Sequence, residues 1–169
     1  MKEIKFEELK IDTYQMFAKN WPLLTAGNQK KGYNTMTISW GHLGSLWGHN
    51  MPTVIVYVRP QRYTKKFVDE NEYFTLSILD EKYKSQLAYL GSHSGKDEDK
   101  IHNCGLDVEF VDDTTYIKPS KIVLVCRKLY QQSLKEENFI DKKVMQDAYP
   151  NSDYHDMYIA QIEKVLMVV

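Results

Sequence analysis

A run of small hydroxyl side chains followed by glycines occupies residues 34–48. If the run is a strand, its alternating faces carry hydroxyls (Thr35, Thr37, Ser39) and apolar side chains (Met36, Ile38, Trp40). A flat heteroaromatic ring with carbonyls and ring nitrogens needs this combination of clearance, hydrogen bonds and an apolar wall. The pattern is equally typical of a half-buried strand whose polar face meets water.

Four cations lie close together in the next polar stretch, residues 59–66. Besides Arg59, Arg62 and two lysines, the stretch holds Tyr63 and Thr64. A phosphate dianion is bound by the planar fork of arginine, by hydroxyls and by the free N–H groups at the start of a helix. The alternative is a solvated basic turn in which Thr64 is an ordinary helix cap.

The elements that must position these stretches are mostly short strands separated by turns. Strands are expected at 21–27, 33–40, Val54–Val58, Tyr73–Leu79, Asp107–Val111, Lys121–Leu129 and Met157–Val168. Short helices are expected after Thr64 as a cap, after Asp80 as a cap and as far as Gly91, and over residues 141–149 before Pro150. Because strands and helices do not alternate regularly, the pattern predicts a mainly β protein. It would be an antiparallel barrel with α decoration, in a single domain over residues 1–169.

The composition narrows the classes of function. The 22 Lys and Arg residues nearly balance the 23 Asp and Glu residues, so the chain has no field that would gather nucleic acid or an anionic membrane. The charged N-terminus and the short apolar runs predict neither a signal peptide nor a membrane span, and we expect a cytoplasmic protein. Cys104 and Cys126 are too few for a disulfide framework and are expected to be reduced.

Four motifs occur in an order that is similar to one known family. They are residues 34–41 (NTMTISWG), residues 58–64 (VRPQRYT), residues 94–100 (SGKDEDK) and residues 155–159 (HDMYI). Together they resemble the flavin reductase-like, flavoredoxin-like family of FMN-binding split β-barrels, over nearly the whole chain from about Trp21 onward. The resemblance implies a Greek-key antiparallel split barrel that forms a homodimer with FMN at the subunit interface.

The resemblance also implies roles for individual residues. The isoalloxazine ring would lie along Asn34, Thr35, Met36, Thr37, Ser39 and Trp40, and the ribityl phosphate would contact Arg59, Tyr63 and Thr64. Ser94, Gly95, Lys96 and Lys100 would come near the flavin, and His155 would stand at the edge of the site. The chain departs from the family at Lys96, where arginine is common and lysine offers a point charge rather than a fork. It departs again at Asp156, where a small hydroxyl residue often follows the histidine.

Other kinds of site find less support in the sequence. The glycines at 41, 44 and 48 do not form a dinucleotide-binding fingerprint. The stretch 91–95 has histidine where a nucleophile elbow needs serine. The spacing of His93, His102 and Cys104 matches none of the usual zinc patterns, so no metal site is expected.

The function that follows is a flavin reductase-like oxidoreductase in which NADH or NADPH gives hydride to the flavin N5 atom. The cofactor would perform the difficult step, and the protein would supply position and electrostatics. His155 is the one candidate for a catalytic residue, as a proton donor, since an unperturbed histidine has a pKa of about 6.5. A flavoredoxin-type electron carrier and a non-catalytic flavin-binding protein need the same cradle, and both stay open.

Overall fold

The computed structural model describes residues 1–168, which fold mainly into antiparallel strands. The strands are β1 (Lys2–Ile4), β2 (Leu23–Asn28), β3 (Gly32–Thr37), β4 (Gly41–Ser45), β5 (Pro52–Val58), β6 (Tyr73–Leu79), β7 (Asp107–Val111), β8 (Thr114–Lys118), β9 (Ser120–Ser133) and β10 (Asp156–Met167). The α-helices are α1 (Thr13–Gln15), α2 (Thr64–Glu70), α3 (Lys84–Ser92), α4 (Lys100–Asn103) and α5 (Lys142–Ala148). Short 3-10 turns cover Phe6–Glu8, Glu81–Tyr83 and Glu136–Asn138, and a π-helical turn covers Met16–Asn20.

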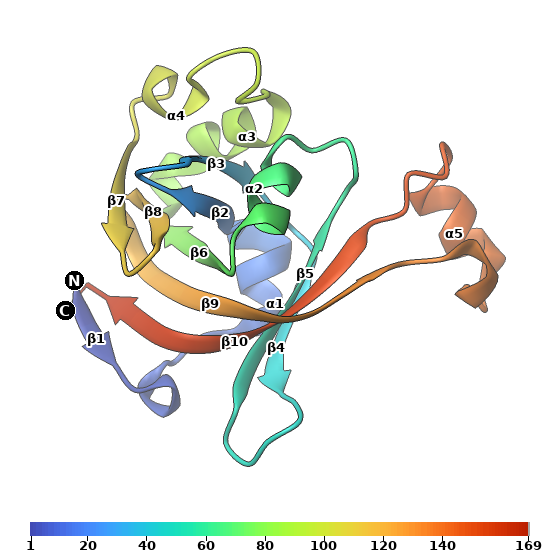
Figure 1. Ribbon diagram of the computed structural model, residues 1–169, viewed down its shortest axis with the longest axis horizontal. Helices are drawn as coiled ribbons and strands as arrows, with labels where there is room; N and C mark the ends of the chain where they lie inside the picture. Colours follow the sequence, from blue (N-terminus) through green and yellow to red (C-terminus); the bar gives the residue numbers. More distant parts are fainter. Residues whose placement is uncertain (169) are drawn as a thin grey trace.

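The main sheet has the strand order β3-β2-β6-β9-β10-β5-β4, with β1 paired to β10 and a separate β7–β8 hairpin. Strands β5 and β6 follow each other in sequence but are separated in the sheet by β9 and β10. Their connection therefore has to cross the end of the barrel, and it carries the arginine turn and α2 (Figure 1). This crossing is what brings the arginine turn back to β3.

Two adjacent leucines show how β2 and β6 are buried on both faces. Leu24 joins the core inside the barrel, together with Leu76 and Leu124. Leu23 joins a second cluster outside, with Leu87 and Leu90 of α3. Because neighbouring strand residues point to opposite faces, a strand buried on both sides does not alternate between buried and exposed residues, and these two strands bury Thr25, Thr75 and Ser77 as well.

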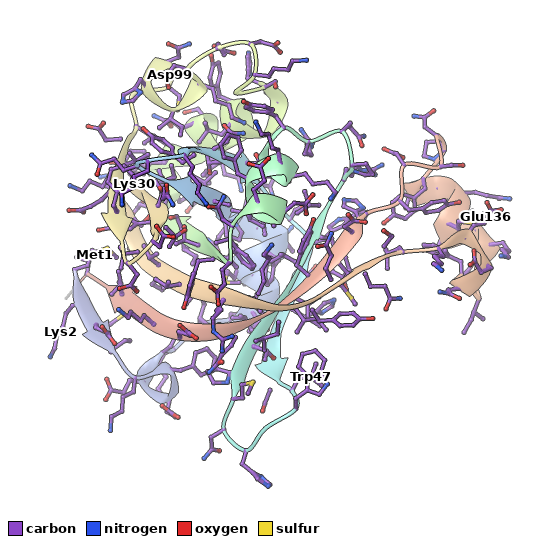
Figure 2. All side chains as sticks on the ribbon, viewed as in Figure 1. Met1, Lys2, Lys30, Trp47, Asp99 and Glu136 are labelled. Carbon is purple, nitrogen blue, oxygen red and sulfur yellow. The ribbon has the colours of Figure 1, made fainter. Side chains whose placement is uncertain are left out.

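Two projections leave the body of the molecule (Figure 1). The β4–β5 hairpin ends near Trp47, which is 61% exposed, and the distal parts of β9 and β10 extend into an arm that carries α5 (Figure 2). Ile140 in this arm is fully exposed and Val144 is half-exposed. Such exposed apolar side chains on projecting segments suit contact with another molecule.

The predicted strands are confirmed as elements, with some differences in their bounds, and three strands were not predicted. β1 and β8 are short, and β8 follows a turn at Asp112, whose φ of 50° is typical of tight hairpins. β4 begins at Gly41, directly after the strand predicted over 33–40, where only glycines and no further strand were expected. A Cβ on Gly41 would lie 2.3 Å from the Phe17 ring, so this glycine permits a close approach rather than a turn.

The helix caps agree with expectation at Asp80 but not at Thr64. The Asp80 carboxylate accepts a hydrogen bond from the backbone N–H of Lys82, as predicted. Thr64 is instead the first residue of α2, and Tyr63 precedes it as the N-cap without a side-chain cap bond. The prediction that Thr64 caps the helix is wrong because its hydroxyl is engaged by Asn34.

Candidate functional site

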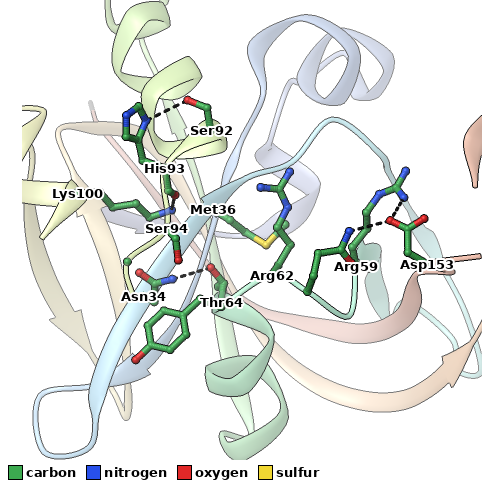
Figure 3. A pocket seen from close by; sticks show the side chains of 13 residues that line it. Asn34, Met36, Arg59, Arg62, Thr64, Ser92, His93, Ser94, Lys100 and Asp153 are labelled. Carbon is green, nitrogen blue, oxygen red and sulfur yellow. Dashed lines mark hydrogen bonds and ion pairs between the residues drawn. The ribbon is translucent and has the colours of Figure 1, made fainter. Parts of the chain in front are cut away.

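The hydroxyl-rich strand and the arginine turn meet at a buried hydrogen bond. Asn34 Nδ2 of β3 donates to Thr64 Oγ1 of α2 over 2.9 Å, and both side chains are almost fully buried (Figure 3). Gly95 lies directly on the other side of Asn34, since a Cβ there would stand 2.1 Å from Asn34 Oδ1. Three separate motifs of the sequence thus converge on one amide side chain.

A cavity of about 360 Å³ opens where these segments meet, and we call it the cationic cavity. Its lining comes from β3, the arginine turn, the loop after α3 and the segment before β10: Asn34, Met36, Arg59, Gln61, Arg62, Tyr63, Thr64, Ser92, His93, Ser94, Gly95, Lys100 and Asp153. Three of these side chains are cations and one is a carboxylate, so the cavity has an excess of positive charge. Such a site suits an anion.

Arg59 is held within the chain on one side of this cavity. Its guanidinium forms an ion pair with Asp153, donates to the Ala148 carbonyl over 2.9 Å, and lies 5.1 Å from the centre of the Tyr149 ring. Hydrogen bonds from Gln61 and Arg59 hold the pKa of Asp153 below its ordinary value. Arg59 is therefore positioned by the arm, and Asp153 neutralises part of its charge.

Lys100 and Arg62 supply positive charge without such a partner. Lys100 is 4% exposed, and its Nζ donates to the carbonyls of Leu90 and His93, each over 2.8 Å. Burial, with the nearby charge of Arg62, lowers the pKa of Lys100 to about 8. Neither Lys100 nor Arg62 forms a salt bridge with any residue in 1–168. An ammonium group buried without a counter-charge favours a bound anion.

A second, smaller cavity of about 190 Å³ adjoins the first, and we call it the aromatic cavity. It is lined by Met36, Thr37, Ile38, Ser39, Trp40, Tyr57, Arg59, Arg62 and His155. Met36, Arg59 and Arg62 line both cavities. A ligand with a charged end and a flat end would find the two environments next to each other.

His155 lines the aromatic cavity and lies inside a group of rings. Its imidazole is 4.8 Å from Trp40 between ring centres and 6.4 Å from Tyr57, and Nδ1 lies 2.8 Å from the Tyr149 hydroxyl. Burial, helped by the charge of Arg59, lowers the pKa of His155 to about 4. The imidazole is therefore neutral at pH 7, which removes the premise that an unperturbed histidine would donate a proton there.

The structure brings most of the predicted site residues to the two cavities, in two groups. The cationic cavity receives Asn34, Met36, Arg59, Tyr63, Thr64, Ser94, Gly95 and Lys100. The aromatic cavity receives Thr37, Ser39, Trp40 and His155. Lys96 is exposed and lines neither cavity.

Thr35 also stays outside, because its side chain points to the opposite face of β3. It is fully buried, where its hydroxyl bonds to that of Thr25 over 2.8 Å and lies 3.2 Å from the Leu24 carbonyl. Thr35 therefore does not offer its hydroxyl to a ligand, and Thr37 lines the aromatic cavity although its hydroxyl donates to the Leu87 carbonyl. Asn34 and Met36 face the cavity instead.

Several lining residues were not among the predicted site residues. Arg62 and Gln61 belong to the arginine turn, so the density of polar side chains there was a usable signal. No sequence motif marks Asp153, Tyr57 or His93 as a site residue. The fold alone brings them to the cavities. His93 stacks on Tyr89 with ring centres 3.8 Å apart, and His102 pairs with Asp99 over 2.7 Å.

A third hollow, the apolar groove, lies beside the aromatic cavity and shares Ser39, Trp40 and Tyr57 with it. Its volume is about 650 Å³, and it is lined by the N-terminal segment on one side and the arm on the other. Its apolar lining includes the side chains of Tyr14, Phe17, Phe139 and Val144. Within residues 1–168, no helix has the length and apolar character needed to cross a membrane.

Comparison with solved structures gives the same architecture. Flavoredoxin of Desulfovibrio vulgaris (Miyazaki F) superposes with a TM-score of 0.67 at 19% identity, over 99% of this chain and 76% of that one. An FMN-binding domain of a flavin reductases-like enzyme from Shewanella baltica gives 0.67 at 16% identity, over 97% and 75%. A putative flavin reductase with a split barrel domain from Shewanella frigidimarina gives 0.66 at 16%, over 96% and 76%. At these identities the likeness shows the fold, which is the split barrel that the resemblance implies.

Comparison with sequences supplies the family. No curated protein matches the chain. The family model described as the flavin reductase like domain matches residues 14–167, which include both cavities and the arm. The match covers β2 to β10 and all the motifs on which the resemblance rests. The chain therefore belongs to the flavin reductase-like domain family.

Proposed function

We propose that the chain binds FMN across the cationic and aromatic cavities and works as a redox flavoprotein, with NADH or NADPH as the hydride donor. One observation carries the proposal: the two cavities share Met36, Arg59 and Arg62. A place for an anion and a place for a flat ring are therefore continuous. The FMN-binding neighbours with the same fold support this choice of ligand.

The residues of the cationic cavity fit a phosphate ester. Arg62 and Lys100 offer cationic donors, and Ser94 and Thr64 offer hydroxyls. The single carboxylate, Asp153, is already paired with Arg59 and does not cancel the remaining charge. Charge-assisted hydrogen bonds to phosphate are among the stronger contacts that a protein surface can make.

The residues of the aromatic cavity would orient the ring and limit the access of water. When bound, FMN would supply the hydride-accepting N5 atom, and no side-chain nucleophile is needed for that chemistry. Trp40 and Tyr57 would form apolar walls, and Ser39 would offer a hydroxyl at the rim. His155 would act as a neutral hydrogen-bonding group rather than as an acid.

We also propose that the chain works as a homodimer with the flavin near the subunit interface. The apolar groove opens beside the aromatic cavity, and its walls include exposed side chains such as Tyr14 and Val144. Covering such a surface with a second copy would remove apolar area from water. Gel filtration at decreasing protein concentration, monitored by flavin absorbance, should show FMN leaving as the dimer dissociates.

Titration of the purified full chain with FMN and with riboflavin tests the ligand. FMN should bind at least tenfold more tightly, because riboflavin has the same ring but no phosphate for the cationic cavity. Equal affinity would contradict the assignment of the cationic cavity to phosphate. Failure of both ligands to bind would overturn the proposed function.

Anaerobic mixing of the FMN-loaded protein with NADH or NADPH tests the reaction. Rapid bleaching of the flavin absorbance band is the expected result and supports an oxidoreductase. If neither nucleotide bleaches the band but a reduced partner protein does, the chain is an electron carrier, and the hydride-transfer part of the proposal fails.

A further inference from the structure

The hydroxyl of Tyr149 and the ring of His155 form a buried pair next to the aromatic cavity. Tyr149 follows α5 and His155 precedes β10, so the pair closes the short connection between this helix and this strand. The Tyr149 oxygen lies 2.8 Å from His155 Nδ1, and the two residues are 5% and 8% exposed. Tyr149 also packs on Trp40 and Phe139, so its ring has a fixed position.

We propose that Tyr149 is a positioning residue that holds His155 as the Nε2–H tautomer, so that the imidazole presents a neutral hydrogen-bond donor to the aromatic cavity. A neutral imidazole has one nitrogen that donates and one that accepts. If the phenol donates to Nδ1, then Nε2 must carry the hydrogen. The hydroxyl of Tyr149 thereby determines that the His155 nitrogen available to a ligand is a hydrogen-bond donor.

The surroundings of the pair favour this direction of the hydrogen bond. Burial raises the pKa of Tyr149, against the opposing effects of Arg59 and of the His155 backbone, so the phenol keeps its proton. Burial, then the charges of Arg59 and Arg62, keep His155 neutral, although Asp153 and Asp156 act in the opposite direction. Both partners are thus uncharged at pH 7, and a phenol is a better donor than acceptor toward a neutral imidazole nitrogen.

The reverse arrangement would leave a hydrogen without a partner. If Nδ1 donated to the phenol oxygen, the Tyr149 hydroxyl would need another acceptor, and none lies within hydrogen-bonding distance in residues 1–168. Buried polar groups are rarely left unpaired, because each such group costs about 1–3 kcal/mol. Nε2 also has no hydrogen-bond partner within residues 1–168, but it is not one of the buried unpaired atoms there, and His155 lines the aromatic cavity, so a hydrogen on Nε2 can bond to water. It is therefore available to an acceptor on a bound ligand, such as a carbonyl or carboxamide oxygen.

The tautomer can be measured directly, without any ligand. In protein labelled with ¹⁵N-histidine, long-range ¹H–¹⁵N correlation spectra distinguish the two neutral tautomers and the imidazolium. The signals of His155 are identified among the five histidines by their loss in His155→Gln. We expect the Nε2–H pattern in the wild-type chain at pH 7.

Tyr149→Phe keeps the aromatic ring and removes only the hydroxyl, so it should change the His155 pattern to a mixture of tautomers or to the Nδ1–H form. Tyr154→Phe is the matched control: Tyr154 packs against Tyr149, and its hydroxyl reaches Glu136 rather than the histidine. The control should leave the His155 pattern unchanged. A purely structural role of Tyr149 would affect stability but would not select a tautomer.

An Nδ1–H or imidazolium pattern in the wild-type chain would overturn the inference, even if the variant fails to fold. An unchanged pattern in Tyr149→Phe would overturn it as well. The meaning of the tautomer for a ring ligand rests on the proposed function, but its measurement does not. If the tautomer behaves as expected and flavin does not bind, the proposed function fails while the positioning role stands.

Discussion

The two cavities differ in how they would hold a ligand. The cationic cavity contains Arg59, Arg62 and Lys100 with a single carboxylate, whereas the aromatic cavity places the neutral His155 among Trp40 and Tyr57. Binding at the first should depend on charge, and therefore on pH and salt. Binding at the second, which shares Arg59 and Arg62 with the first, should depend more on shape and on neutral hydrogen bonds. A ligand that spans both would gain affinity at one end and orientation at the other.

The largest expected effect is that of Arg59→Ala on FMN binding. Removing the guanidinium leaves the Asp153 carboxylate without its ion-pair partner, so the cavity loses a cation and retains an uncompensated negative charge. Loss of charge-assisted contacts of this kind costs about 1.5–3 kcal/mol, or tenfold or more in affinity. Fluorescence titration with FMN measures the change.

Riboflavin is the control ligand for Arg59→Ala, since it reaches the aromatic cavity but has no phosphate. Its affinity should fall by less than that of FMN, because Arg59 also lines the aromatic cavity but has no phosphate to bind there. The double variant Arg59→Ala/Asp153→Asn should recover part of the FMN affinity. If it does not recover, repulsion by Asp153 is not the cause.

Gly95→Ala should have the next largest effect on FMN binding. It tests the contact between β3 and the loop that follows α3. The new Cβ would stand 2.1 Å from Asn34 Oδ1, so either the loop or the amide must move. Overpacking of this kind costs about 1–3 kcal/mol of unfolding free energy. FMN affinity should fall with it, since Asn34 also holds Thr64.

Gly44→Ala is the matched control for Gly95→Ala, because a Cβ at residue 44 meets nothing within 4 Å. Urea unfolding should show this variant to be as stable as the wild-type chain or slightly more so. A comparable loss of stability in both variants would argue against a tight contact at Gly95.

A smaller effect is expected on the pH dependence of folding stability and of FMN binding, through the ammonium group of Lys100. Its pKa is lowered from 10.5 to about 8 in the folded chain, mainly by burial, so the unfolded chain holds this proton over a range where the folded chain has released it. Folding stability should therefore rise with pH between these two values, relative to Lys100→Met. A bound phosphate would favour the charged form, so FMN binding just above pH 8 should take up protons.

Calorimetry in buffers with different heats of ionisation measures that proton uptake. Riboflavin binding should take up fewer protons, since it brings no phosphate to the cationic cavity. Equal uptake for both ligands would mean that Lys100 does not sense the phosphate.

The smallest expected effect on binding is that of Thr35→Val, which separates the two faces of β3. The Thr35 hydroxyl bonds to Thr25 on the face away from the cavities, so FMN affinity should stay within about twofold. Unfolding free energy should fall by about 1–3 kcal/mol, because a buried hydroxyl loses its partner. A large loss of FMN affinity without loss of stability would place Thr35 in the site after all.

The class of the fold and the segments of the site could be predicted from the sequence, because both depend on local patterns. Period-two alternation and turn residues predicted most strands, and the cluster of cations between β5 and α2 marked one end of the site. The face of β3 that meets the cavity could not be predicted in the same way. Both faces of β3 are buried. The period-two pattern therefore assigns each side chain to one of two faces but does not indicate which face meets a ligand.

The sequence by itself determined which residue types are available: an arginine turn, a hydroxyl-rich strand and a glycine loop that resemble those of one family. Only the tertiary structure decided how they are used. It paired Asp153 with Arg59 across 94 positions of sequence, buried Lys100 without a counter-charge, and set the rings of Tyr149 and His155 against Trp40. Charge pairing and burial depend on distances between segments that are remote in sequence, and these distances arise only when the strands pair.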